Sequence, residues 1–238
     1  MKIITESIKN NLEMWFGKPI DAISSKDIET ITSLNVCGID SFGNQQTVNL
    51  DELNLFESLN SISIENLKMT NEELSKLKKY KKINFKNCVL ESLCQLSVDM
   101  ESLRFDSCII NDYDGLEKFK SLISFQVSRP FGGPQLSVEK IDFPILEDLE
   151  LSGVPEGYVS DYSFLQRIEN LRQLYITDTN FSLDNLKSNK HLENVYLSDE
   201  LYERNSNGFA TFSNVTFHRG LMDLIYFAPE SEETPIKK

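Results

Sequence analysis

The chain has 238 residues and a formal net charge of −13 at pH 7, from 37 acidic and 24 basic side chains. An acidic surface repels phosphate backbones and anionic lipid, which argues against nucleic acid or membrane surfaces as partners. The sequence contains no run of the roughly 18 apolar residues that a membrane helix needs, and no apolar block of a secretory signal follows Met1. We therefore expect a cytoplasmic protein.

Residues 1–26 carry apolar side chains at helical spacing before any repeat begins. These side chains are Ile4, Ile8, Leu12, Trp15 and Phe16. The first unit of a repeat array has no preceding neighbour, so its core must be covered at that end. We predict that residues 1–26 form a helical N-terminal cap, with Trp15 as part of the cover. Ser24 and Asp27 have the spacing of a capping box and predict a second short helix before Ile31.

From Ile31 to Phe217 the phrase apolar-x-x-apolar-x-apolar occurs nine times, at steps of 20 to 28 residues. Its middle residues are Leu34, Ile62, Ile83, Leu103, Phe125, Leu149, Leu174, Val195 and Val215. Several repeats continue backwards in apolar steps of three, which is typical of a short helix or a 3₁₀ turn. Phrase and period resemble the leucine-rich repeat, whose units are about 20–29 residues long. This resemblance implies an α/β fold over residues 27–218, a right-handed solenoid of about nine coils with a concave parallel β-sheet and a convex side of short helices or 3₁₀ turns.

Two longer loops, at 129–135 and 154–160, interrupt the rhythm in adjacent repeats. Both follow a predicted strand, so we expect them to lie side by side at one rim of the sheet. Inserted loops on one face often bind ligands in repeat proteins, but neutral variation in length explains them equally well, and their contribution to binding stays open. Residues 219–238 are predicted to be a C-terminal cap followed by a disordered acidic tail.

The segment from Ile23 through Asp27 to Val36 resembles the entry to the repeat region of bacterial internalin-like proteins, where a short capped helix precedes an I-T-x-L-x-L strand. That resemblance implies a bacterial protein. It also implies an exported internalin-like adhesin as one alternative function.

The residues that usually carry chemistry show no catalytic or metal-binding pattern. His191 and His218 have no nucleophile or ligand partner in the sequence, so we interpret both as surface groups. Cys88 and Cys108 occupy the same place in consecutive repeats, five residues after Ile83 and Leu103, where a small side chain lies inside the turn. No C-x-x-C pair exists, which favours reduced, structural cysteines. We expect no enzyme activity, no metal and no cofactor.

The residues beside the apolar ones in each phrase alternate outward onto the concave sheet. They give a basic patch, an acidic group and a pair of tyrosines in register, all of which we predict to bind. The predicted binding residues are Lys82, Lys86, Arg104, Asp106, Asp148, Glu150, Tyr175 and Tyr196. Tyrosine and arginine are favoured anchors of interfaces. The sequence therefore predicts a monomeric protein–protein interaction module; an acidic inhibitor or immunity protein that blocks a basic enzyme or toxin is the main alternative.

Overall fold

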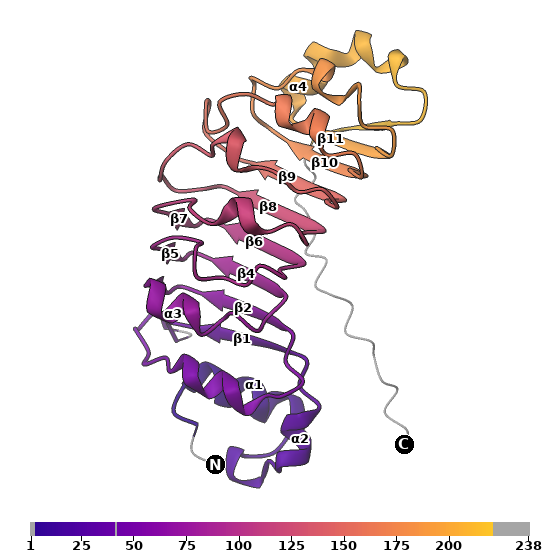
Figure 1. Cartoon of the computed structure of the whole chain (residues 1–238). Helices are drawn as coiled ribbons and strands as arrows, with labels where there is room; N and C mark the ends of the chain where they lie inside the picture. Colours follow the sequence, from indigo (N-terminus) through magenta and orange to yellow (C-terminus); the bar gives the residue numbers. More distant parts are fainter. Residues whose placement is uncertain (1–2, 41, 221–238) are drawn as a thin grey trace, which may run out of the picture.

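The computed structural model describes residues 3–40 and 42–220 and shows a mixed α/β chain built on one large, open parallel sheet (Figure 1). Nine strands follow one another across this sheet in chain order. They are β1 (Ser33–Cys37), β2 (Ser61–Glu65), β4 (Lys82–Lys86), β6 (Ser102–Asp106), β8 (Ser124–Ser128), β9 (Asp148–Ser152), β10 (Gln173–Ile176), β11 (Asn194–Leu197) and β12 (Thr216–Arg219). Each strand pairs in parallel with the next, so the units repeat the same contact along an elongated stack. The predicted acidic tail lies outside the described residues.

The second and fourth residues of the strands from β1 to β11 point into the core, where they form continuous apolar rows. One row runs through Leu34, Ile62, Ile83, Leu103, Phe125, Leu149, Leu174 and Val195 in register. These are the middle residues of the first eight phrases, whose register is confirmed. Within the neighbouring row, the Phe85 and Phe105 rings stack at 5.6 Å between centroids. The strands therefore form because each buries alternate side chains against the units on both sides.

The predicted register of the ninth phrase is wrong by two residues. Val195 pairs with Phe217, and not with Val215. The return segment before β12 contains α4 (Asp199–Asn205) and the 3₁₀ helix η7 (Ser206–Thr211). The Phe209 ring stacks on Phe217 at 4.0 Å, and the Phe212 ring meets Phe217 edge-on at 5.7 Å. Phe212 is the C-cap residue of η7 and so belongs to the return segment, and the strand therefore begins later than the apolar pattern alone indicates.

A recurring turn follows the strands and leads into a second parallel sheet of β3 (Lys68–Met69), β5 (Val89–Leu90) and β7 (Ile109–Ile110). The first turn residue has a left-handed backbone in four consecutive units, with φ between 50 and 57°: Asn66, Asn87, Ser107 and Arg129. Each of these N–H groups donates to the carbonyl of the last residue of the next strand, at 2.8–2.9 Å. Cys88 and Cys108 lie buried inside this turn, as predicted, and their thiols donate to backbone carbonyls at 3.3–3.4 Å.

Short helical segments return the chain from one strand to the next. They are η2 (Leu50–Leu55), α3 (Asn71–Ser75), η3 (Leu116–Lys118), η4 (Val138–Lys140), η5 (Ser163–Arg167) and η6 (Leu183–Leu186), while the similar helix α2 (Ser25–Glu29) leads into β1. The capping box predicted at Ser24 and Asp27 is present at the start of α2. Thr70 and Glu73 form another at the start of α3. These caps satisfy orphan N–H groups of helices too short to persist without their neighbours.

The N-terminal helix α1 (Glu6–Phe16) lies against β1 at the edge of the large sheet (Figure 1). The Asn11 amide donates to the Asn35 carbonyl at 2.7 Å, and the Cys37 N–H donates to the Ser7 hydroxyl at 3.0 Å. Backbone groups that would otherwise lack a strand partner are therefore satisfied by side chains of α1.

Two side chains predicted for the buried face of this helix are more than two-fifths exposed. Ile4 is 44% exposed because it precedes the helix, so helical spacing does not apply to it, and Ile3 is buried with Ile8 and Leu12 instead. Trp15 lies in the last turn, just before Gly17 ends the helix in a left-handed conformation, and is 43% exposed. The prediction that Ile4 and Trp15 cover the first unit is therefore wrong in these two particulars.

Candidate functional site

The outward face of the large sheet carries two polar rows that run across all nine strands in register. The first residues of the strands form the front row, and the third residues form the central row. The front row is Ser33, Ser61, Lys82, Ser102, Ser124, Asp148, Gln173, Asn194 and Thr216. The central row is Asn35, Ser63, Asn84, Arg104, Gln126, Glu150, Tyr175, Tyr196 and His218.

The C-terminal end of the central row is a stack of three half-buried rings, which we call the aromatic stack: Tyr175, Tyr196 and His218. The tyrosine rings are nearly parallel, with centroids 4.2 Å apart, and His218 continues the stack at 4.3 Å from Tyr196. The spacing is close to the separation of neighbouring strands, so the pairing of β10, β11 and β12 itself aligns the rings. The prediction that Tyr175 and Tyr196 occupy equivalent places is confirmed.

The front row holds the aromatic stack in place through hydrogen bonds. The Tyr175 hydroxyl donates to the Gln173 side-chain oxygen at 3.0 Å, and His218 Nε2 lies 2.9 Å from Asn194 Oδ1. Burial, together with the neighbouring Tyr196 hydroxyl, raises the pKa of Tyr175 above its ordinary value. Its phenol therefore keeps its proton, and its capacity to donate a hydrogen bond, to a higher pH than an ordinary tyrosine does. Sequence reasoning missed His218 as a member of this site, because the ninth phrase was placed two residues too early.

Asp148 stands in the front row of β9, beside Gln173, and is half-buried. Loss of hydration raises the pKa of its carboxyl, the negative charge of Glu147 adds to this rise, and Arg172 opposes it. Within the described part of the chain, no hydrogen bond or ion pair reaches this carboxylate. Arg172 instead contacts Glu193 at 2.9 Å and Glu147 at 3.6 Å. Asp148 is therefore a partly desolvated carboxylate with unused acceptor capacity.

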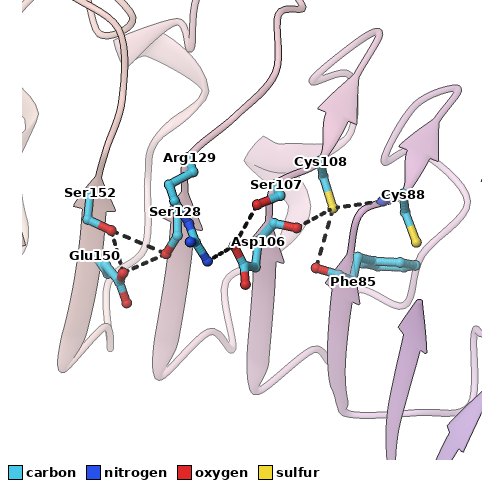
Figure 2. Close-up of polar contacts among 9 residues, drawn as sticks. All are labelled: Phe85, Cys88, Asp106, Ser107, Cys108, Ser128, Arg129, Glu150 and Ser152. Atoms are coloured by element: carbon cyan, nitrogen blue, oxygen red, sulfur yellow. Dashed lines mark hydrogen bonds and ion pairs between the residues drawn. The ribbon is translucent and has the colours of Figure 1, made fainter. Parts of the chain in front are cut away.

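Two other predicted acidic binding residues, Asp106 and Glu150, are 5% and 3% exposed and serve the fold (Figure 2). One Glu150 oxygen accepts from both the Ser128 and Ser152 hydroxyls at 2.5 Å. The prediction that both acids are presented to a partner is wrong, because their side chains turn toward the strand ends, where hydroxyl and guanidinium donors lie.

The partner of Asp106 comes from the loop after β8. Arg129 donates to Asp106 Oδ1 at 2.8 Å, and the Ser107 hydroxyl donates to the same oxygen at 3.0 Å (Figure 2). Arg129 adopts one of the left-handed turn conformations described above, and its side chain reaches Asp106 at the end of β6. This contact ties the start of the 129–135 loop to the sheet.

The predicted basic residues lie on β4 and β6, several strands away from the aromatic stack. Lys82 is exposed in the front row and Arg104 is half-buried in the central row. Lys86 is half-buried at the end of β4, in register with Asp106. The sheet face is therefore divided into a basic part at β4 and β6 and an aromatic part with Asp148 at β9 to β12.

The two long loops lie side by side, as expected. The Leu136 N–H donates to the Tyr158 carbonyl at 2.9 Å, and the Gln135 amide donates to the Gly157 carbonyl at 2.5 Å. The buried hydroxyls of Tyr113 and Tyr158 also form a hydrogen bond with each other. Phe131, at the tip of the first loop, is 63% exposed.

Across residues 3–40 and 42–220, no three His, Cys, Asp or Glu side chains are grouped so that they could hold a metal ion. In the same part of the chain, no helix has the length and apolar content needed to cross a membrane.

The chain matches no known protein family and no curated protein. Among solved structures, a protein from Bacteroides fragilis aligns with 17% sequence identity over 74% of this chain and 73% of its own, with a TM-score of 0.38. This likeness is too distant to indicate a function.

Proposed function

We propose that this protein is a non-enzymatic interaction module of the leucine-rich repeat type, which binds a protein partner on the outward face of the nine-stranded sheet. The aromatic stack is the observation that carries the proposal. Its rings contribute nothing to the apolar core of β10 and β11, which Leu174, Ile176, Val195 and Leu197 fill. Half-exposed aromatic side chains aligned on a rigid sheet are typical anchors of protein interfaces.

The repeat architecture is supported by three regularities. Strands in parallel register recur at steps of 20 to 28 residues, a left-handed residue opens four successive turns, and buried cysteines fill equivalent turn positions. Parallel strands joined by such crossovers are right-handed in about 98% of cases. These regularities support the proposal of a right-handed solenoid with the sheet on its concave side. The proposed N-terminal cap, residues 1–26, is supported by the hydrogen bonds that side chains of α1 form at the edge of β1.

The acidity of the chain favours the inhibitor or immunity alternative, in which the partner is a basic enzyme or toxin. A net charge of −13 accelerates encounter with a basic protein, and salt weakens that effect. All four cysteines are free, which supports the proposed cytoplasmic location, because a reducing compartment keeps thiols in this state.

Site-specific photocrosslinking tests where a partner sits. A photoreactive amino acid at Thr216, in the front row of β12, reports on the sheet face beside the aromatic stack. The same residue at Lys187, an exposed position after η6, is the matched control. The proposal predicts a crosslinked partner from position 216 and none from position 187. Crosslinks from position 187 alone would contradict it.

A further inference from the structure

At the β9 end of the aromatic stack, one face of the Tyr175 ring is covered by no other aromatic ring of the described residues. Tyr196 covers the side of Tyr175 toward β11, with the two ring planes 6° apart. Since β10 lies between β9 and β11, the opposite face of Tyr175 is turned toward β9. The residue in register there is Glu150, whose carboxylate is held by Ser128 and Ser152 toward the strand ends. The Tyr175 hydroxyl leans the other way, toward Gln173 in the front row.

Asp148 stands on β9, the strand toward which this face of the ring is turned. It occupies the front row of β9, directly beside Gln173, and the charges of Asp148 and Glu150 both add to the burial that raises the pKa of Tyr175. Carboxylates that lose hydration are normally paired, as the buried Asp106 and Glu150 are, whereas Asp148 is only half-buried. Asp148 has no such partner among the described residues, and burial raises the pKa of its carboxyl. A cation placed here restores the favourable interactions that the carboxylate lost with water.

On this geometry we propose that Tyr175 and Asp148 form a subsite for an arginine side chain of the protein partner, lying flat on the β9-facing side of the Tyr175 ring. The inference rests on the proposed function, because it names the chemistry of the group that the sheet face receives. A guanidinium is planar, so it extends a stack whose members are already 4.2 and 4.3 Å apart. Its N–H groups also donate in a fork that matches a carboxylate, which a lysine ammonium does not do.

The chain's own nearby arginine does not fill the subsite. Arg172 precedes β10 and engages Glu193 and Glu147, with no ion pair to Asp148. Both of these glutamates are exposed, and they directly precede β9 and β11. Arg104, the arginine of the central row, lies on β6, with β8 between it and β9. Among the described residues, neither Arg172 nor Arg104 therefore forms an ion pair with Asp148, and an arginine from outside the chain can supply that pair.

Small amide probes test the subsite directly, with no partner protein in the sample. N-acetyl-arginine methylamide, its lysine counterpart and its neutral citrulline counterpart are titrated into the full chain at constant ionic strength, and NMR shifts of residues 148, 173 and 175 are followed. The arginine probe should shift these signals, and the lysine and citrulline probes should bind more weakly. Asp148→Asn should weaken arginine binding about tenfold, as expected for loss of a charge-assisted hydrogen bond. Asp184→Asn, at an exposed acid paired with Lys187, is the matched control and should change nothing.

Three results would overturn the subsite: no shift at these residues, equal binding of the lysine or citrulline probe, or equal binding by the Asp148→Asn and Asp184→Asn proteins. A folded Asp148→Asn protein is ensured by checking that its melting temperature is not lowered. The experiments distinguish failure of the subsite from failure of the proposed function. If a partner crosslinks at Thr216 but the arginine probe binds equally well with and without the Asp148 carboxylate, only the subsite is wrong. If the probe binds as expected but a partner crosslinks only at Lys187, the subsite stands as a cation site and the interaction face is wrong.

Discussion

Phe105→Ala is expected to destabilise the protein by about 3–5 kcal/mol, the range for removing a buried phenylalanine ring. Phe105 is 1% exposed and fills the space between three units, since its ring stacks on Phe85 at 5.6 Å and meets Phe125 edge-on at 6.4 Å. Each ring pair contributes about 0.5–1.5 kcal/mol beyond area burial, so two lost pairs place the effect toward the upper part of the range.

Urea denaturation followed by circular dichroism measures this effect as a change in unfolding free energy at constant m-value. Phe131→Ala is the matched control, because that ring is 63% exposed and its loss should change stability by less than about 0.5 kcal/mol. Phe105→Leu should recover part of the loss by refilling some of the volume. If Phe105→Ala costs no more than Phe131→Ala, the reasoning that adjacent units share one interdigitated core is wrong.

Four further outcomes follow from the same geometry. Glu150→Ala should cost about 1–3 kcal/mol in urea denaturation, because it strands the Ser128 and Ser152 hydroxyls in a buried position; an unchanged midpoint contradicts the buried network. Asp148→Asn should raise the unfolding free energy at pH 7, since burial raises the pKa of this carboxyl and its ionised form destabilises the folded state. That gain should shrink as the pH falls through the raised pKa, and vanish below the ordinary value of 3.8, so a pH-independent gain refutes the desolvation argument. Deletion of residues 1–26 should cause aggregation or loss of cooperative unfolding, as size-exclusion chromatography and thermal melting can show, whereas a soluble and equally stable product means that α1 is an appendage. Tyr175→Ala should cost only about 1 kcal/mol, the scale of one ring pair, with cooperative unfolding retained.

Local sequence pattern was enough to place the strands wherever apolar residues alternate and repeat. Leu149 and Leu174 could be aligned from sequence because each has an apolar residue three positions before it and another two positions after it. The structure pairs these two leucines. The same reasoning failed at Val215, since Phe212 still belongs to the end of η7 and β12 begins only at Thr216. This slip of two residues hid His218 from the predicted surface. The apolar pattern of the sequence alone could not have revealed this two-residue shift.

The chemistry of the sheet face was less predictable than its position. Alternation correctly placed Asp106, Asp148 and Glu150 outside the apolar core, but it carries no information on which way a side chain bends after leaving the strand. Serines at the strand ends draw Glu150 into a buried network, and Arg129, from a loop that the repeat pattern does not describe, reaches back to Asp106. The side-by-side placement of Tyr175 and Tyr196 was predictable because parallel register determines it.

The affinity of a captured partner for the Tyr175→Ala/Tyr196→Ala double variant tests the central claim most directly. The comparison is with Lys187→Ala, which alters an exposed side chain away from the sheet. If the aromatic stack anchors the partner, the double variant should weaken binding by about 2 kcal/mol or more, while Lys187→Ala leaves it unchanged. Equal weakening by the two variants, or no weakening by the double variant, would contradict the claim that the protein binds through this face.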